Sequence, residues 1–305
     1  MSVIKATNLD LNKITFSDIK TNNYGGKMVF CNVDGGKILI QTPKMYVPNG
    51  IKRWRKKDAV DNKDDSFEME LSFGGEDKNP EIRAFHDKMN EFDNVVKKHI
   101  LSHSKEMLGK PKLSMELIEN AFYTPTVKVP TDKEGNILEY PDRIRTKLDR
   151  ERNGDDFTGR FLAYKKPATP LLIFDENKTI LPIDENNFES VVPKGSQSVA
   201  VLELVYLSIT TKVSAKWKLV QAKVTRNQQN ISGYAMIDEE TEIEEAVQED
   251  LDSETPVTQE PSEDVEDVED VEVEDDDEVM EDDIEAEPVP VAPKPKSRGR
   301  KAVVA

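Results

Sequence analysis

Two hydrophobic patterns organise the first 225 residues of the chain. Residues 66–73 alternate strictly, with four apolar side chains on one side and Glu68 and Glu70 on the other. This period of two predicts a strand with one buried and one exposed face. Residues 27–33 and 37–42 are apolar runs separated by Asp34, Gly35 and Gly36, which predicts a hairpin.

A different period follows from residue 80. Between 80 and 108 the apolar residues recur at steps of three and four, and Gly109 and Pro111 supply a stop. The spacing predicts one long amphipathic helix that packs on a sheet, and a shorter helix is expected over 113–121. Further strands are expected at 123–129, 159–164, 171–174, 199–209 and 217–225. The set favours a mainly β fold, an OB-fold-like antiparallel barrel with one long inserted helix.

The pattern changes completely after residue 237. Residues 238–287 contain 28 acidic residues and no Lys or Arg. Such a segment cannot bury enough apolar surface to offset the entropy of ordering its backbone, so it is expected to be a disordered acidic tail. A proline-spaced basic extension occupies 288–305. The predicted organisation is therefore a domain at 1–237, a tail at 238–287 and an extension at 288–305.

This division changes the meaning of the net charge of −18. Residues 1–237 hold 37 basic and 32 acidic residues, so the predicted domain is mildly basic. An unfolded acidic chain tethered to a basic body competes for any nearby anion site, most strongly at low salt. The charge asymmetry is the first indication of function.

Several classes of protein are disfavoured. Cys31 is the single cysteine and lies in an apolar run, which excludes a disulfide framework and indicates a reducing, intracellular compartment. No signal-peptide or membrane-spanning apolar stretch is found. Catalytic motifs and phosphate-binding glycine loops are missing, so neither an enzyme nor a cofactor is expected. His99 and His103 are four apart, but no further ligand motif accompanies them, and no metal is expected.

The densest cationic and aromatic cluster predicts a nucleic-acid site. Cations release counterions from phosphates, and an exposed aromatic ring offers a surface for base stacking. The alternative is that Trp54 covers the end of the barrel while the cations are simply solvated, and both interpretations remain open. The residues expected to bind DNA in this cluster are Lys52, Arg53, Trp54, Arg55, Lys56 and Lys57.

Two other basic segments are interpreted differently. Residues 143–152 mix bases with acids and favour a charged loop or surface helix over a DNA contact. Tyr164, Lys165 and Lys166 stand at the end of a predicted strand and are expected to contribute to DNA binding. Trp217 is expected to pack in the core.

The runs at 36–45 and 48–50 and the strand at 217–224 resemble the single-stranded-DNA-binding proteins of large nucleocytoplasmic DNA viruses. That family is similar to phage replisome binding proteins that join an OB-fold to an acidic C-terminal tail. The resemblance implies DNA coating in replication, recombination or repair at a viral replication site in the host cytoplasm or nucleus, with replisome proteins as partners of the tail. This chain departs from the pattern by ending in Lys301-Ala-Val-Val-Ala305, which places tail-mediated docking in doubt.

The predicted function is sequence-independent binding of single-stranded DNA, with the acidic tail competing for the DNA groove. The alternative is a histone-chaperone-like or virion packaging protein that acts through its tail. No membrane partner is expected, and the sequence leaves a homodimer open.

Overall fold

The computed structural model describes residues 2–22, 25–55, 63, 65–132, 134–154 and 156–226. The predictions for the acidic tail, the basic extension, Lys56 and Lys57 lie outside these residues. The described chain reaches Arg226, so the predicted domain boundary at 237 stays a prediction. Among the described residues, no helix combines the length and the apolar character needed to span a membrane.

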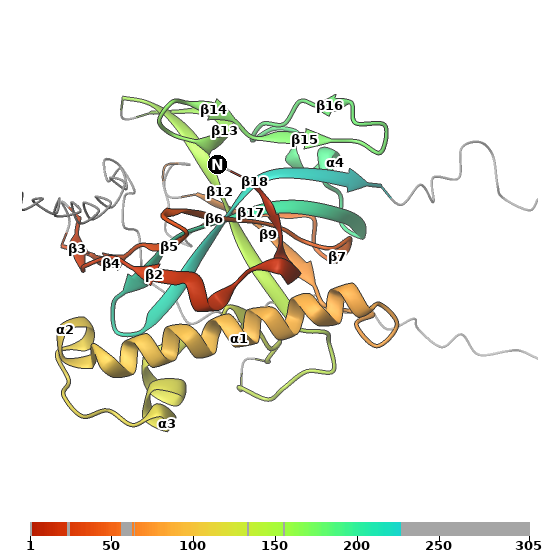
Figure 1. The fold of residues 1–305 in the computed structure, drawn as a ribbon. Helices are drawn as coiled ribbons and strands as arrows, with labels where there is room; N and C mark the ends of the chain where they lie inside the picture. The colour runs from red at the N-terminus through yellow and green to blue at the C-terminus, as the bar shows by residue number, and fades with distance from the viewer. Residues whose placement is uncertain are drawn as a thin grey trace, which may run out of the picture.

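Six strands close into a barrel (Figure 1). β17 pairs antiparallel with β18 and, on its other side, with β6 and β7. β18 pairs in parallel with β12, β12 pairs antiparallel with β9, and β9 returns to β7 where Ser72 meets Tyr46. The strands are β6 (Gly36–Gln41), β7 (Met45–Val47), β9 (Ser66–Ser72), β12 (Arg143–Asn153), β17 (Ser196–Ile209) and β18 (Val213–Thr225).

The order of these strands identifies the architecture. If the consecutive β6 and β7 count as the first strand, the order around the barrel is first, second, third, fifth and fourth. Among these barrel strands, the parallel pair joins the third strand to the fifth. This arrangement is an OB-like barrel. The predicted fold class is confirmed, and the long helix is inserted between the second and third strands.

The inserted helix is α1 (Pro80–Ser102), which lies across one side of the barrel (Figure 1). Asn79 caps its N-terminus by accepting hydrogen bonds from the backbone N–H groups of Glu81 and Ile82. The predicted apolar stripe is buried, and Phe92 meets Trp217 edge to face at 5.7 Å between ring centroids. The other helices are α2 (Ser104–Leu108), α3 (Met115–Leu117), a π-helical turn (Ile118–Phe122), α4 (Phe188–Val191) and 3₁₀ turns at Ala6–Asn8 and Leu11–Lys13.

Shorter strands extend the barrel walls. The predicted hairpin forms between β5 and β6, where Asp34 and Gly35 both have positive φ, at 51° and 77°, as a type I′ turn requires. The remaining strands are β1 (Ile4–Lys5), β2 (Ile14–Phe16), β3 (Lys20–Thr21), β4 (Lys27–Val29), β5 (Cys31–Val33), β8 (Ile51–Trp54), β10 (Tyr123–Thr124), β11 (Val127–Lys128), β13 (Asp156–Tyr164), β14 (Thr169–Pro170), β15 (Leu172–Phe174) and β16 (Ile180–Leu181).

Gly50 joins β7 to β8 in a position that only glycine fits. Its φ is +67°, and a Cβ atom there would lie 2.5 Å from the carbonyl oxygen of Val192. The backbone before β8 therefore packs directly against the segment after α4. This contact fixes where the basic strand β8 starts.

Two sequence interpretations are corrected. Residues 143–152 form most of strand β12, and not a charged loop or surface helix, because alternate side chains of this segment fill the barrel interior. Strand 66–73 has the predicted inner face, but Glu70 on the other face is only 6 % exposed. It is buried because arginines of β12 cover it.

Candidate nucleic-acid interface

One row of paired residues crosses the outer face of the barrel. Lys52 of β8 is paired with Glu68 of β9, Glu68 with Lys147 of β12, Lys147 with Lys218 of β18, and Lys218 with Glu203 of β17. Directly paired residues project from the same side of a sheet, and the alternate residues of β9 are fully buried in the core. We call this surface the outer wall. On it lie Tyr46, Lys52, Trp54, Glu68, Glu70, Arg143, Arg145, Lys147, Glu203 and Lys218.

Trp54 lies at the β8 side of the outer wall, where it is paired with Ser66, the first residue of β9. Its half-buried ring has the Nζ atom of Lys52 at 5.3 Å and the guanidinium carbon of Arg145 at 5.9 Å from its centroid. Arg145 belongs to β12, so this contact crosses the intervening strand β9. The indole is therefore set among cations on a wall that spans several strands.

Tyr164 lies at the other side of the same wall. Its ring centroid is 5.0 Å from the Nζ atom of Lys218 and 5.6 Å from that of Lys37. Burial and the nearby Glu203 carboxylate raise the pKa of the Tyr164 hydroxyl, which is therefore neutral at pH 7. Lys165 and Lys166 follow directly in the chain. The two predicted aromatic positions thus flank one surface, on β8 and β13, with β9 and β12 between them.

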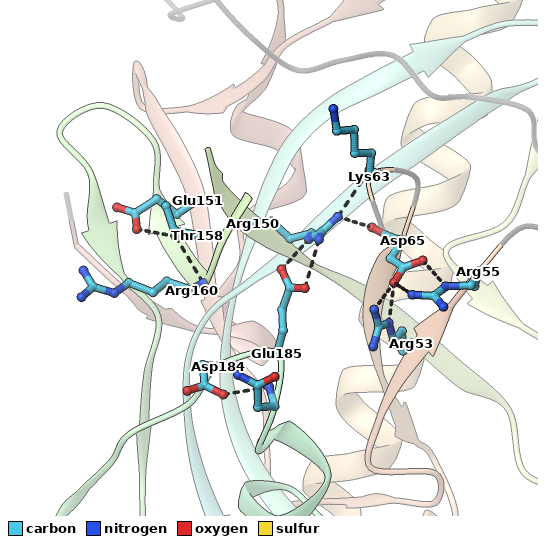
Figure 2. Close-up of polar contacts among 11 residues, drawn as sticks. Arg53, Arg55, Lys63, Asp65, Arg150, Glu151, Thr158, Arg160, Asp184 and Glu185 are labelled. Atoms are coloured by element: carbon cyan, nitrogen blue, oxygen red, sulfur yellow. Dashed lines mark hydrogen bonds and ion pairs between the residues drawn. The ribbon is translucent and has the colours of Figure 1, made fainter. Parts of the chain in front are cut away.

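Arg53 is directed elsewhere, because successive residues of a strand point to opposite faces, and Arg55, the residue after β8, contacts the same group as Arg53. Both bind the buried carboxylate of Asp65 (Figure 2). Arg55 makes two hydrogen bonds of 2.8 Å to it, through Nε and Nη2. The hydrogen bond from Arg55 is the main cause that lowers the pKa of Asp65. The cations predicted to line one groove are therefore divided between two faces.

Arg150 binds the backbone of Asp65, the residue whose carboxylate holds these arginines (Figure 2). Its guanidinium donates to both carboxylate oxygens of Glu185, at 2.7 and 3.0 Å, and to the carbonyl oxygen of Asp65 at 3.1 Å. The group also stacks 3.5 Å from the ring centroid of Phe157. Since Arg150 is 8 % exposed, its contacts are structural.

Acidic residues balance part of the positive charge of the wall. The Glu70 carboxylate lies 3.2 Å from both Arg143 and Arg145 and accepts a hydrogen bond of 3.0 Å from Asn49. Burial alone would raise the pKa of Glu70, but the charges of Arg145 and Lys52 outweigh that effect and lower it. The carboxylate therefore stays ionised at neutral pH and holds the two arginines in place.

Sequence reasoning missed several residues of the wall. Tyr46 on β7 is 43 % exposed and is paired with Ser72, which is itself paired with Arg143. The alternation of Arg143, Arg145 and Lys147 at every second position was a strand signal that could have been found. The residues that sequence reasoning did not assign to a site are Lys37, Tyr46, Arg143, Arg145, Lys147 and Lys218.

The other singled-out residues belong to the core or pack beside it. Trp217 is 4 % exposed and packs as expected. His99 stacks on Phe16 at 3.9 Å, and burial together with His103 lowers its pKa to about 4. Burial raises the pKa of Cys31 to about 12, so its thiol stays neutral. Within the described ranges, no three His, Cys, Asp or Glu side chains converge on a possible metal position.

Solved structures that match the chain include proteins of two bacteriophages. The crystal structure of gp2.5, a single-stranded DNA-binding protein encoded by bacteriophage T7, is 11 % identical, covers 73 % of this chain and 100 % of its own, and has a TM-score of 0.36. The single-stranded DNA-binding protein of bacteriophage Enc34, in complex with single-stranded DNA, is 11 % identical, covers 69 % of this chain and 94 % of its own, and has a TM-score of 0.31. No family model and no curated protein matches the chain. The assignment of the barrel rests on the strand pairing within this chain.

Proposed function

We propose that this protein binds single-stranded DNA across the outer wall of its barrel. The observation that carries the proposal is the placement of Trp54 and Tyr164 on either side of a wall whose central row includes Lys52 and Lys147. The centre of the wall is formed by the second and third strands of an OB-like barrel, the face that binds oligonucleotides in this architecture.

The chemistry of the wall matches an unpaired strand. Bases of a single strand are free to stack on aromatic rings, whereas the bases of a duplex are already stacked on one another. Lys147 is exposed and Lys52 is half-buried, so both ammonium groups are placed to approach phosphates. Neither stacking nor phosphate contact identifies a base, so binding is largely sequence-independent.

The acidic tail is proposed to compete with DNA for this wall. Its 28 acidic residues are covalently tethered to a domain with a small positive excess. Because both interactions are electrostatic, salt weakens the tail's competition together with DNA binding.

Removal of residues 238–305 is therefore expected to raise the affinity for a labelled single-stranded 30-mer at low salt. The difference between the full-length and shortened proteins should shrink as salt is added, because salt screens both interactions. Fluorescence anisotropy titrations over a salt series measure both quantities. Equal affinities of the two proteins in dilute buffer would contradict competition by the tail, while binding by both would still support the proposed binding of single strands.

A cellular role in viral DNA replication, recombination or repair, a replisome partner for the tail and a viral replication site are proposed on the family resemblance described above. A second function, as a histone-chaperone-like or packaging protein, is favoured by the acidic run alone. Comparison of the isolated tail and the shortened protein for binding to histones and to oligonucleotides separates the two, because the second function places the binding in the tail.

A further inference from the structure

Four charged side chains form a continuous chain of ion pairs beside Tyr164. Glu203 of β17 contacts Lys37 of β6 at 3.0 Å and Lys218 of β18 at 3.5 Å. Lys218 also lies 3.5 Å from the carboxylate of Asp149 on β12. Two positive and two negative charges from four barrel strands are thereby balanced within one cluster.

Most of this cluster is withdrawn from water. The side chain of Glu203 is 1 % exposed, that of Asp149 is 5 % exposed and that of Lys218 is 9 % exposed. A buried ion pair is a poor source of stability, because the cost of desolvating two charges offsets their attraction, and apolar residues of similar size often serve as well. The residues two positions to either side of Glu203 are Val201 and Val205. The strand therefore accommodates apolar residues nearby, and stability alone does not account for the cluster.

The cluster determines the position of two cations around one aromatic ring. Lys37 and Lys218 are the two residues whose ammonium groups lie 5.6 and 5.0 Å from the centroid of Tyr164. These distances are within the range of a cation–π interaction. Glu203 forms ion pairs with both lysines, so one buried carboxylate contacts both ammonium groups that lie beside the ring. The ring itself is only partly covered.

We propose that Glu203 is a positioning residue for single-strand binding, which acts through Lys37 and Lys218 to hold the Tyr164 ring in the orientation on which a base stacks. This inference rests on the function proposed above and adds a role for a residue that is too buried to touch DNA.

The inference predicts that loss of the Glu203 charge changes the affinity for DNA in the direction opposite to that expected from simple electrostatics. Removal of a negative charge from a DNA-binding wall strengthens phosphate binding. Loss of an oriented stacking surface weakens binding instead. The variant Glu203→Gln therefore separates the two effects. Glu91→Gln is the matched control, because it removes the same charge from an ion pair with a lysine, Lys88 at 2.7 Å, but lies on helix α1 and not on the outer wall.

The experiment compares full-length wild-type and variant proteins on two labelled 30-mers, an oligothymidylate and a strand of the same length without bases. The ratio of the two affinities reports base stacking separately from phosphate contacts. Glu203→Gln is expected to lower this ratio about fivefold or more, the lower limit for one stacked base. Glu91→Gln is expected to leave the ratio unchanged.

A Glu203→Gln protein that keeps the wild-type ratio would overturn the inference while leaving the proposed function intact. A wild-type protein that binds neither strand would contradict the proposed function itself. Because Glu203→Gln removes the partner of a buried lysine, the double variant Glu203→Met/Lys218→Met provides a second test with an apolar replacement and an unchanged net charge. It is expected to unfold cooperatively and to show the same decrease in the ratio of the two affinities. A wild-type ratio in the double variant would also overturn the inference.

Discussion

Replacement of both Trp54 and Tyr164 by alanine is expected to remove about 2–6 kcal/mol of the free energy of binding to single-stranded DNA, because each stacked base contributes about 1–3 kcal/mol. The two rings flank the outer wall from β8 and β13, and they contact different cations. Their losses should therefore add, since distant sites without shared partners behave independently. Anisotropy titrations of the two single variants and the double variant measure whether the two losses of binding free energy add.

Tyr140→Ala is the matched control for this experiment. Tyr140 is 60 % exposed, and it lines a pocket of about 360 Å³ beside His86 and Asp142 instead of the outer wall. Its removal is expected to leave the affinity unchanged. A double variant that binds single strands as tightly as the wild-type protein, with an unchanged unfolding midpoint, would contradict the assignment of the wall.

Replacement of Arg150 by methionine is expected to lower the free energy of unfolding by about 3–5 kcal/mol, the cost of leaving one partner of a buried ion pair uncompensated. The side chains of Arg150 and Glu185 are 5 % and 8 % exposed and are joined by two parallel hydrogen bonds. Arg150 also binds the backbone carbonyl of Asp65, whose carboxylate holds Arg53 and Arg55. Urea denaturation followed by circular dichroism measures the loss.

The double variant Arg150→Met/Glu185→Met tests the cause of that loss. With both charges removed, it should be more stable than Arg150→Met alone, because no charge is left buried without a partner. A double variant that is less stable than the single variant by a further several kcal/mol would show that the packing of the two side chains, and not the charge imbalance, determines stability.

The sequence predicted the barrel because its patterns are local. Alternation at 66–73 and the helical period at 80–108 each report which side of one element is buried, and both inner faces are buried as expected. Strand β12 was missed because its exposed side is basic and its inner side includes Thr146 and Arg150, so the segment carries little apolar signal.

The site could be predicted only in part, because its charges are balanced by residues far away in the sequence. Trp54 and Lys52 were found as a dense local cluster. The burial of Glu70 by arginines 73 and 75 residues further along depends on strand pairing that no local pattern reveals. The contacts of Arg53 and Arg55 with the single carboxylate of Asp65 likewise depend on the pairing of β8 with β9. The chain of ion pairs that includes Glu203 arises in the same way, since it joins side chains of β6, β12, β17 and β18.

The most direct test of the account is a titration of residues 1–237 in dilute buffer with two labelled 30-mers, one single-stranded and one duplex. Binding that depends on stacking on Trp54 and Tyr164 requires unpaired bases, so the protein should bind the single strand clearly more tightly, and added salt should weaken that binding steeply. Failure to bind the single strand, or equal binding to the duplex, would contradict the central claim that the outer wall of this barrel holds unpaired DNA.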